Sequence, residues 1–450
     1  MYIDPVSDSA DAGVVEAISL LALREVSSRE LVESCLARIR ERDGTHSHDG
    51  DPSSINAWVR VYENDALAAA DRADARLAEG DAAPLCGVPV GLKDLYAVAG
   101  KPLTASSRLL EDVPERSCDA WVRLEAAGMV LLGHLHTHEF AAGGTTDQVG
   151  NPAALDRSAG GSSGGSAAAL AARMTPAATG TDTAGSLRIP SALCGTSTIK
   201  PTRGLVPTRG IVPLCPTLDH AGPMARSLAD CEPLLAALAG TSPPPQRVPL
   251  GRVAVSPRLG LVELDADVAD GFDAALAACR SLGAELVDAP APDVELELGQ
   301  TFLDVVCAEM LVYHRRFDDR RDLYRPSIRG FLEYGEHRAM QAEEYVAAQE
   351  RRTEATLRWL DWFAEHRIDA LLEPTVPIVA RPRGLGYDEA FTDVAEISLT
   401  HYWNWTGFPV ASLPSGVGRR SGLPVGVSLI GAARTDWDVL AAGIALQSCL

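Results

Sequence analysis

The sequence predicts an α/β fold with one large β-sheet. Short apolar stretches rich in β-branched residues alternate with stretches of helical periodicity along the chain, and this alternation is typical of α/β proteins. Hydrophobic residues make up 46% of the 450 residues, which is ample for a large buried core. A Pro-rich break at 241–249 is interpreted as a surface connection within the sheet, with a domain boundary as the alternative.

The N-terminal part begins with two helices within residues 13–42. Apolar residues recur at helical spacing in the first, and Ser28 is expected to cap the second, which has acids in its first turn and arginines in its last. Residues 43–54 are polar and Gly-containing and indicate a loop. A short extended segment and a helix that ends at Gly80 follow.

Strands and helices alternate through the remainder of the chain. The stretch at 87–98 is apolar and strand-like around one charged pair, and residues 301–366 are mainly helical. Further helices are predicted at 121–128 and 267–283, and further strands at 129–133, 251–256, 284–289, 371–379 and 408–416. This order predicts a sheet that gathers strands from both halves of the chain.

The charge of the chain excludes several classes of partner. Its formal net charge of −21 repels phosphate backbones, and the densest basic stretch, residues 315–325, is interleaved with aspartates and is interpreted as a solvated helix face. No apolar run is long enough to span a bilayer. We therefore expect neither nucleic acid nor a membrane as a partner.

Cysteine usage and the N-terminus bear on the compartment. Nine cysteines occur without a CxxC pair, which is typical of reduced thiols rather than of a disulfide framework. Residues 1–13 are acidic and lack the apolar core of a signal peptide. Both observations predict a cytoplasmic protein.

Lysine is nearly absent from the chain, and each one present raises the question of what arginine could not do there. Only Lys93, Lys101 and Lys200 occur. Arginine does not deprotonate in proteins, whereas a desolvated lysine has a lowered pKa and can act as a base. Lys93 ends an apolar strand-like stretch and is a candidate for this role. On this segment alone, an exposed strand end or a lysine paired with Asp94 is the better interpretation.

A Gly- and Ser-rich block at 159–166 precedes an alanine-rich helix. The helix argues against a linker, and the absence of GxxxxGK[ST] argues against a phosphate loop. G-x-S-x-G is formally present at 160–164 and 161–165, but a nucleophile elbow needs a preceding strand, and residues 151–159 (NPAALDRSA) are not predicted to form one.

A second small-residue segment occupies 180–190 (GTDTAGSLRIP). Small residues before Ser186 would allow consecutive backbone N–H groups to converge on one point, as an oxyanion hole requires. An ordinary turn is an equally good interpretation of this stretch when it is considered alone.

The three segments together are far more specific than any one of them. Lys93 in GVPVGLKD, the GGSSGGSAAA block and GTDTAGSLRIP occur in this order, and with LDHAGPMARSLAD at 218–230 they resemble the amidase signature family. The resemblance covers nearly the whole chain and is densest over 87–230. It implies a single domain over 1–450, with a large twisted mixed β-sheet covered by helices on both faces and a variable helical substrate region at about 301–366.

The resemblance also implies roles for individual residues. Ser186 matches the nucleophile, Ser162 the bridging serine held by a cis peptide bond, and Lys93 the base of a Ser-cisSer-Lys triad. The N–H groups of four residues match the oxyanion hole: Thr183, Ala184, Gly185 and Ser186. Supporting roles fall to Ser163 and Asp182, Lys200 is expected to be structural and Lys101 to lie at the surface, and no cofactor is implied.

Alternating histidines follow the predicted strand at 129–133. His134, His136 and His138 would share a face if the strand continued, which suits a metal, but no acid or cysteine cluster supports such a site and we expect none. In the family the middle position is often Asn and borders the active site, so His136 is expected to contact substrate. Ala184 stands where Gly is commoner and would narrow the oxyanion loop.

The predicted function is hydrolysis of the C–N bond of a small or medium carboxamide, anilide or carbamate through an acyl-enzyme. One alternative is the glutaminase subunit of a tRNA-dependent amidotransferase, although no glutamine-binding set is matched in 301–406; another is a Ser/His/Asp hydrolase that uses His220. Substrate determinants are expected in 100–115, 136–150 and 301–345. Five side chains suggest an apolar acyl or aryl pocket, although they could equally belong to the core: Phe302, Val306, Met310, Phe331 and Tyr334. The sequence leaves a homodimer open.

Overall fold

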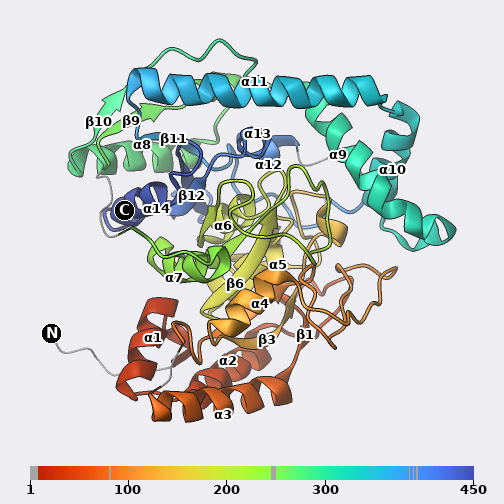
Figure 1. The fold of residues 1–450 in the computed structure, drawn as a ribbon, viewed down its shortest axis with the longest axis vertical. Helices are drawn as coiled ribbons and strands as arrows, with labels where there is room; N and C mark the ends of the chain where they lie inside the picture. The colour runs from red at the N-terminus through yellow and green to blue at the C-terminus, as the bar shows by residue number, and fades with distance from the viewer. Residues whose placement is uncertain (1–8, 81–82, 245–249, 385, 389, 392–393) are drawn as a thin grey trace.

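A mixed β-sheet forms the centre of the structure (Figure 1). The computed structural model describes residues 9–80, 83–244, 250–384, 386–388, 390–391 and 394–450. Within these residues the main sheet has eleven strands in the order β1-β3-β2-β6-β8-β7-β12-β13-β11-β9-β10. Their bounds are β1 Trp58–Val61, β2 Pro89–Lys93, β3 Val130–Leu135, β6 Ala177–Asp182, β7 Ser197–Lys200, β8 His220–Ala225, β9 Arg252–Val255, β10 Glu285–Val287, β11 Ala370–Pro374, β12 Val410–Val417 and β13 Pro424–Ile430.

Both parallel and antiparallel pairs occur across the sheet. β2 runs parallel to both β3 and β6, and β9 runs parallel to β10 and β11. β6, β8, β7, β12, β13 and β11 pair antiparallel in succession. Strands from both sides of the Pro-rich break therefore share one sheet, as predicted. Residues 245–249 of that break, and residues 1–8 of the N-terminal segment, lie outside the described residues.

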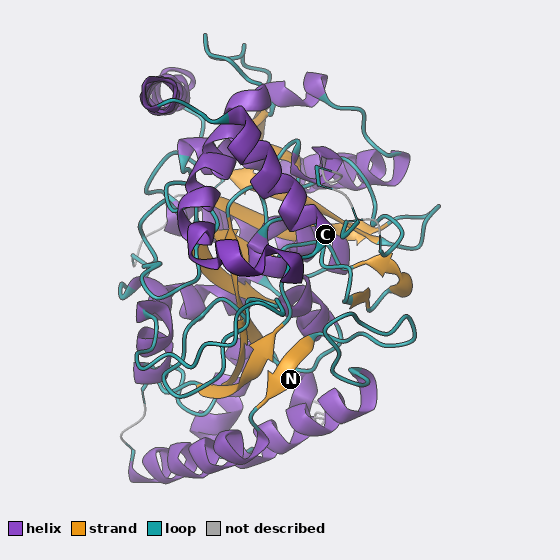
Figure 2. Cartoon of the chain, turned by 90° about the vertical axis from the view of Figure 1, so that its right-hand side faces the viewer, coloured by secondary structure: helices purple, strands orange, loops and turns teal. Residues whose placement is uncertain are grey.

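Helices lie on both sides of the strands (Figure 2). Side chains alternate across a strand, and in β6 Ala177 belongs to the larger apolar core while Ala178 belongs to a second core on the other face. Helices α7 and α14 contribute to the first core, and α5 to the second. The helices are α1 Val14–Leu23, α2 Ser28–Arg42, α3 Glu63–Glu79, α4 Asp119–Ala126, α5 Gly164–Ala171, α6 Arg188–Cys194, α7 Leu228–Ala239, α8 Ala266–Ser281, α9 Gly299–His314, α10 Pro326–Arg338, α11 Ala342–His366, α12 Val394–Ile397, α13 His401–Thr406 and α14 Asp436–Gln447.

The peripheral helices occupy opposite ends of the molecule. α1, α2 and α3 lie together at one end, and the long α11 crosses the other, where α9 and α10 descend beside it (Figure 1). Short 3₁₀ helices occur at Ser9–Asp11, Glu139–Ala141, Pro257–Leu261 and Arg315–Leu323. Among the described residues, no helix combines the length and the apolar character that crossing a bilayer demands.

Two local predictions need correction. The cap of α2 is Ser27 rather than Ser28: its hydroxyl accepts from the backbone N–H of Glu30, whose carboxylate accepts from the Ser27 N–H in return, a capping box. Residues 151–159 do contain a strand, because β5 (Ala154–Ser158) pairs with β4 (Gly150–Asn151) in a small separate sheet. Pairing across a tight turn overrides the weak strand propensity of NPAALDRSA.

Candidate active site

Lys93 is the last residue of β2, and its side chain is completely buried. Its Nζ atom lies 2.7 Å from Ser162 Oγ, 2.8 Å from Ser163 Oγ and 2.8 Å from Thr181 Oγ1. Thr181 is positioned by β6, which pairs directly with β2. Three hydroxyl groups therefore surround one amine at a point where two neighbouring strands end.

Burial controls the charge of this amine. The loss of solvent lowers the pKa of Lys93 well below its usual value, because the buried environment disfavours the ammonium form. The carboxylates of Asp182 and Asp219 act in the opposite direction, but no carboxylate bonds directly to Nζ within the described residues. The surroundings of Lys93 consequently favour a neutral amine with a lone pair available.

The Gly-rich loop that carries Ser162 packs against the backbone of residues 138–146. The Gly161–Ser162 peptide bond is cis, as the family resemblance predicts. A side chain at position 161 would collide with the backbone of Thr145, so glycine is required there by close approach. The Ser162 carbonyl accepts from the His138 N–H at 2.9 Å and from Thr146 Oγ1 at 3.0 Å. These contacts hold the loop where α5 begins.

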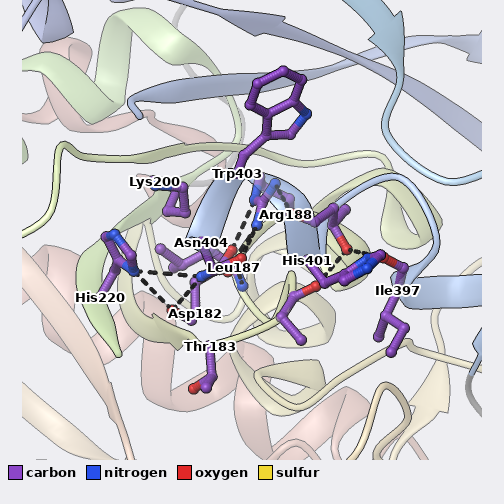
Figure 3. Close-up of polar contacts among 12 residues, drawn as sticks. Asp182, Thr183, Leu187, Arg188, Lys200, His220, Ile397, His401, Trp403 and Asn404 are labelled. Carbon is purple, nitrogen blue, oxygen red and sulfur yellow. Dashed lines mark hydrogen bonds and ion pairs between the residues drawn. The ribbon is translucent and has the colours of Figure 1, made fainter. Parts of the chain in front are cut away.

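A buried network anchors the segment that follows β6 (Figure 3). Both carboxylate oxygens of Asp182 accept from the Arg188 guanidinium, at 2.9 Å each, and neither side chain is exposed. Asn404 Nδ2 donates to the carbonyl and to Oδ1 of Asp182, at 2.8 Å each. The Arg188 guanidinium also donates to Asn404 Oδ1 (2.7 Å) and to the Thr400 carbonyl (3.0 Å). Helix α13 thus ties down both ends of the turn that carries Ser186.

Separate contacts hold the middle of this turn. Thr183 Oγ1 donates to Asp219 Oδ1 at 2.5 Å, and the Thr400 hydroxyl donates to the Ala184 carbonyl. Gly185 has φ +138, and an added Cβ would collide with the Thr400 side chain. The Ser163 N–H donates to the Ser186 carbonyl at 3.3 Å, which joins the turn to the Gly-rich loop.

A cavity of about 620 Å³ opens beside Ser186. This volume suits a drug-sized organic molecule. Most of its lining is apolar and comes from α9, α10 and the segment that leads into α13. Thr183, Ala184 and Ser186 also line it. The lining includes all five of the side chains proposed from the sequence: Phe302, Val306, Met310, Phe331 and Tyr334.

His136 is not among the described residues that line this cavity. Its ring is buried, with Nδ1 3.1 Å from Ser106 Oγ and 3.3 Å from Gln148 Nε2. Only the first of the three alternating histidines belongs to β3, so the expected shared strand face does not form. His134 contacts Tyr62, and His138 contacts the Thr145 carbonyl, so the three rings bond to separate partners.

His220, the base of the alternative Ser/His/Asp hypothesis, points elsewhere. Its Nδ1 lies 2.7 Å from the Leu218 carbonyl. The same atom lies 3.2 Å from the Asp182 carbonyl (Figure 3). Its Nε2 has no hydrogen-bond partner among the described residues. A ring nitrogen adjacent to two carbonyls must donate, so His220 supports the Asp182 backbone. Neither ring nitrogen contacts a serine hydroxyl among the described residues, as a base that activates a serine would.

The other two lysines differ from Lys93 in their surroundings. Lys101 forms an ion pair with Asp65 at the protein surface and is partly exposed. Lys200 is fully buried, and its Nζ donates to the Pro201 carbonyl at 3.2 Å. Neither contacts a serine hydroxyl among the described residues.

Some residues of the site had no clear signal in the sequence. Thr181, Arg188, Thr400 and Asn404 complete the hydroxyl cluster and the network, and His401 lines the cavity. Arg188 stands inside the GTDTAGSLRIP segment, so its place near Ser186 could have been anticipated. Residues 400–404 lie more than two hundred positions downstream of the serines. Only the order of the strands in the sheet places them near Ser186.

The comparisons with known proteins agree with this geometry. A family model described as Amidase matches residues 30–440. Two relatives are glutamyl-tRNA(Gln) amidotransferase subunits: that of Halorhodospira halophila is 37% identical over 93% of this chain and 93% of its own, and that of Roseiflexus castenholzii is 35% identical over 96% and 95%. A crystal structure of an amidase superposes with a TM-score of 0.86 at 31% identity, covering 98% of this chain and 100% of the other. The chain is therefore an amidohydrolase and belongs to the amidase signature family.

Proposed function

We propose that the chain cleaves the C–N bond of a small or medium carboxamide, anilide or carbamate through an acyl-enzyme formed on Ser186. In this proposal Ser162 relays protons between Ser186 and Lys93, and the N–H groups of residues 183–186 bind the oxyanion. The observation that carries the proposal is the buried Lys93 amine within 2.8 Å of three hydroxyl groups, one of them Ser162 Oγ at 2.7 Å.

The hydrogen-bond pattern supports one orientation of the amine lone pair. Ser163 Oγ donates its proton to the Thr181 carbonyl at 3.3 Å, so it accepts from Lys93. A neutral amine has two N–H bonds and one lone pair. If Ser163 and Thr181 Oγ1 accept the two N–H bonds, the lone pair faces the Ser162 hydroxyl. Lys93 would then be oriented to take a proton from Ser162 and from no other group.

The reaction follows from this orientation. Lys93 accepts the proton of Ser162 as Ser162 accepts that of Ser186, and Ser186 Oγ attacks the amide carbonyl. The developing oxyanion needs donors already in place. Within the described residues the N–H groups of residues 183–186 donate no hydrogen bond, so they are available to bind the oxyanion. The relay returns the proton to the leaving nitrogen, and water then cleaves the ester by the same route in reverse.

The lining of the cavity supports an apolar acyl or aryl group. Among the described lining residues, two have acidic or strongly basic side chains, Arg258 and Glu297. The Arg258 guanidinium donates to the carbonyls of Leu399 (2.6 Å), Ser398 (2.8 Å) and Leu296 (3.3 Å), and Glu297 is exposed. Little charge is left to bind a zwitterion, whereas Phe302 and Met310 offer apolar contact.

The glutaminase alternative is favoured by a different observation, the names of the relatives described above. It requires groups that bind the α-ammonium and α-carboxylate of glutamine, in addition to a partner subunit. Hydrolysis of L-glutamine at a rate comparable with that of an apolar amide, or copurification with a partner, would favour it. On the leading proposal, L-glutamine is a poor substrate and the isolated chain is active.

Single substitutions test the triad on a panel of aliphatic amides, anilides and carbamates. Lys93→Met, Ser162→Ala and Ser186→Ala should each lower kcat by at least about 10³-fold, because members of a relay act as a unit. Lys101→Met is the matched control and should retain full activity. Acid quenching during turnover, followed by peptide mass spectrometry, should find the acyl group on the peptide that contains Ser186.

The opposite pattern would support the conventional hydrolase. In that case His220→Gln would abolish turnover while Lys93→Met would not. Substantial turnover by Ser186→Ala would contradict the proposal directly.

A further inference from the structure

His401 is a polar side chain in the wall of the apolar cavity. It is the first residue of α13 and lines the cavity with Phe302, Met310 and Ser186. Its ring packs edge-on against Phe302, with 5.1 Å between ring centroids and an interplanar angle of 77°. The preceding residue, Thr400, bonds to the Ala184 carbonyl, so this wall adjoins the turn that carries Ser186.

The hydrogen bond at one ring nitrogen determines the state of the other. Nδ1 lies 2.7 Å from the Ile397 carbonyl, which can only accept, so Nδ1 carries the proton (Figure 3). Nε2 is then an acceptor, and no hydrogen bond to it is found among the described residues. Burial, with a contribution from Arg258, lowers the pKa of His401 to about 3, so the ring is neutral at ordinary pH.

Several polar side chains of the cavity wall already have hydrogen-bond partners. The Thr183 hydroxyl donates to Asp219, the Ser398 hydroxyl to the Ala395 carbonyl (2.8 Å), and the Tyr334 hydroxyl to Asp304 (2.6 Å). Arg258 is occupied by three backbone carbonyls. His401 Nε2 is thus an uncommitted acceptor in a mainly apolar wall, and such a group favours a ligand that brings a donor.

We propose that His401 is a specificity-determining residue that accepts a hydrogen bond from the acyl portion of the substrate. The preferred substrates are then amides whose apolar acyl group carries a hydroxyl or N–H donor, rather than plain hydrocarbon acyl amides. The inference rests on the proposed function, because it assumes that the acyl group occupies the cavity beside Ser186.

Matched substrates provide the test. We would measure kcat/KM for phenylacetamide, for its α-, 2-, 3- and 4-hydroxy derivatives, and for the corresponding methoxy compounds. A hydroxyl at the position that reaches Nε2 should raise kcat/KM about tenfold over the parent, the scale of one neutral hydrogen bond. The compound with a methoxy group at the same position should show no increase in kcat/KM, because a methoxy oxygen can only accept a hydrogen bond.

The variant His401→Phe keeps the ring and removes the acceptor, and it should abolish the hydroxyl preference. His401→Gln offers a side-chain carbonyl and should restore part of it. The preference is a ratio within one enzyme, so a general loss of stability cancels. Met310→Leu is the matched control, since it alters the lining of the same cavity without removing the ring contact of His401, and it should leave the ratio intact.

Two outcomes would overturn the inference: no hydroxyl position preferred by the unmodified enzyme, or the same preference in His401→Phe. The Kd values of the same amides for Ser186→Ala, measured by calorimetry, give the ratio without turnover and decide the matter for amides that are not cleaved. Turnover that persists in Ser186→Ala would instead contradict the proposed function, so the two failures are distinguishable.

Discussion

Replacing Arg188 by Met tests how firmly the turn that carries Ser186 is held. The substitution removes two bonds to Asp182, one to Asn404 and one to the Thr400 carbonyl, all between 2.7 and 3.0 Å. It also leaves the Asp182 carboxylate buried without its cation. Breaking a buried ion pair from one side typically costs about 3–5 kcal/mol, most of it from the charge that remains.

Thermal unfolding gives the corresponding shift. At about 2.1 cal/mol/K per residue, a 450-residue chain gains about 0.9 kcal/mol/K of entropy on unfolding, so Tm should fall by about 3–5 °C. Differential scanning calorimetry at a fixed scan rate measures the shift, with kcat on the same preparation. Arg188→Lys keeps the charge but loses the bidentate geometry, so its Tm should lie between those of the unmodified protein and Arg188→Met. A fall in Tm below 1 °C with unchanged kcat would refute this account of the network.

Four further predictions concern the site. Because burial lowers the pKa of Lys93, kcat/KM should rise with pH through a value well below 10.5, and Lys93→Arg should be inactive at every pH; a limb near 10.5 would indicate a solvated amine. Thr183→Val should lower kcat about tenfold with KM little changed, since it frees the turn from Asp219, and Thr183→Ser should retain activity; equal losses in both would point to steric rather than hydrogen-bond effects. Gly185→Ala should lower kcat and destabilise the fold, because the added Cβ collides with the Thr400 side chain. Dialysis of the unmodified protein against a chelator should leave kcat unchanged.

Local signals predicted much of the fold. The strand-like stretch at 87–98 contains β2, and the helix predicted at 267–283 corresponds to α8. The mainly helical region at 301–366 contains α10, α11 and all but the first two residues of α9. Periodicity and caps act over a few residues, and for that reason they could be interpreted one segment at a time. Strand order could not be obtained this way, because the choice of neighbour depends on contacts between residues far apart in the chain.

Residues of the candidate site that lie in a local motif could also be predicted from the sequence, and those placed by distant contacts could not. Lys93, Ser162 and Ser186 each belong to a contiguous motif, so the resemblance could assign them in advance. His136 was assigned by its place in such a motif too, yet its ring turns toward Ser106 and Gln148 rather than toward the cavity, since β3 ends before it and the expected strand face is lost. His401 has no motif around it, and only the packing of α13 against α9 places it at the wall.

The dependence of the Ser186 turn on α13 has a consequence for biosynthesis. Translation proceeds from the amino end, and the residues that bond to Ala184 and Asp182, Thr400 and Asn404, are among the last tenth or so to leave the ribosome. β12 and β13, which occupy the middle of the sheet, emerge later still. During synthesis, Lys93, Ser162 and Ser186 are therefore made well before the residues that hold the Ser186 turn in place.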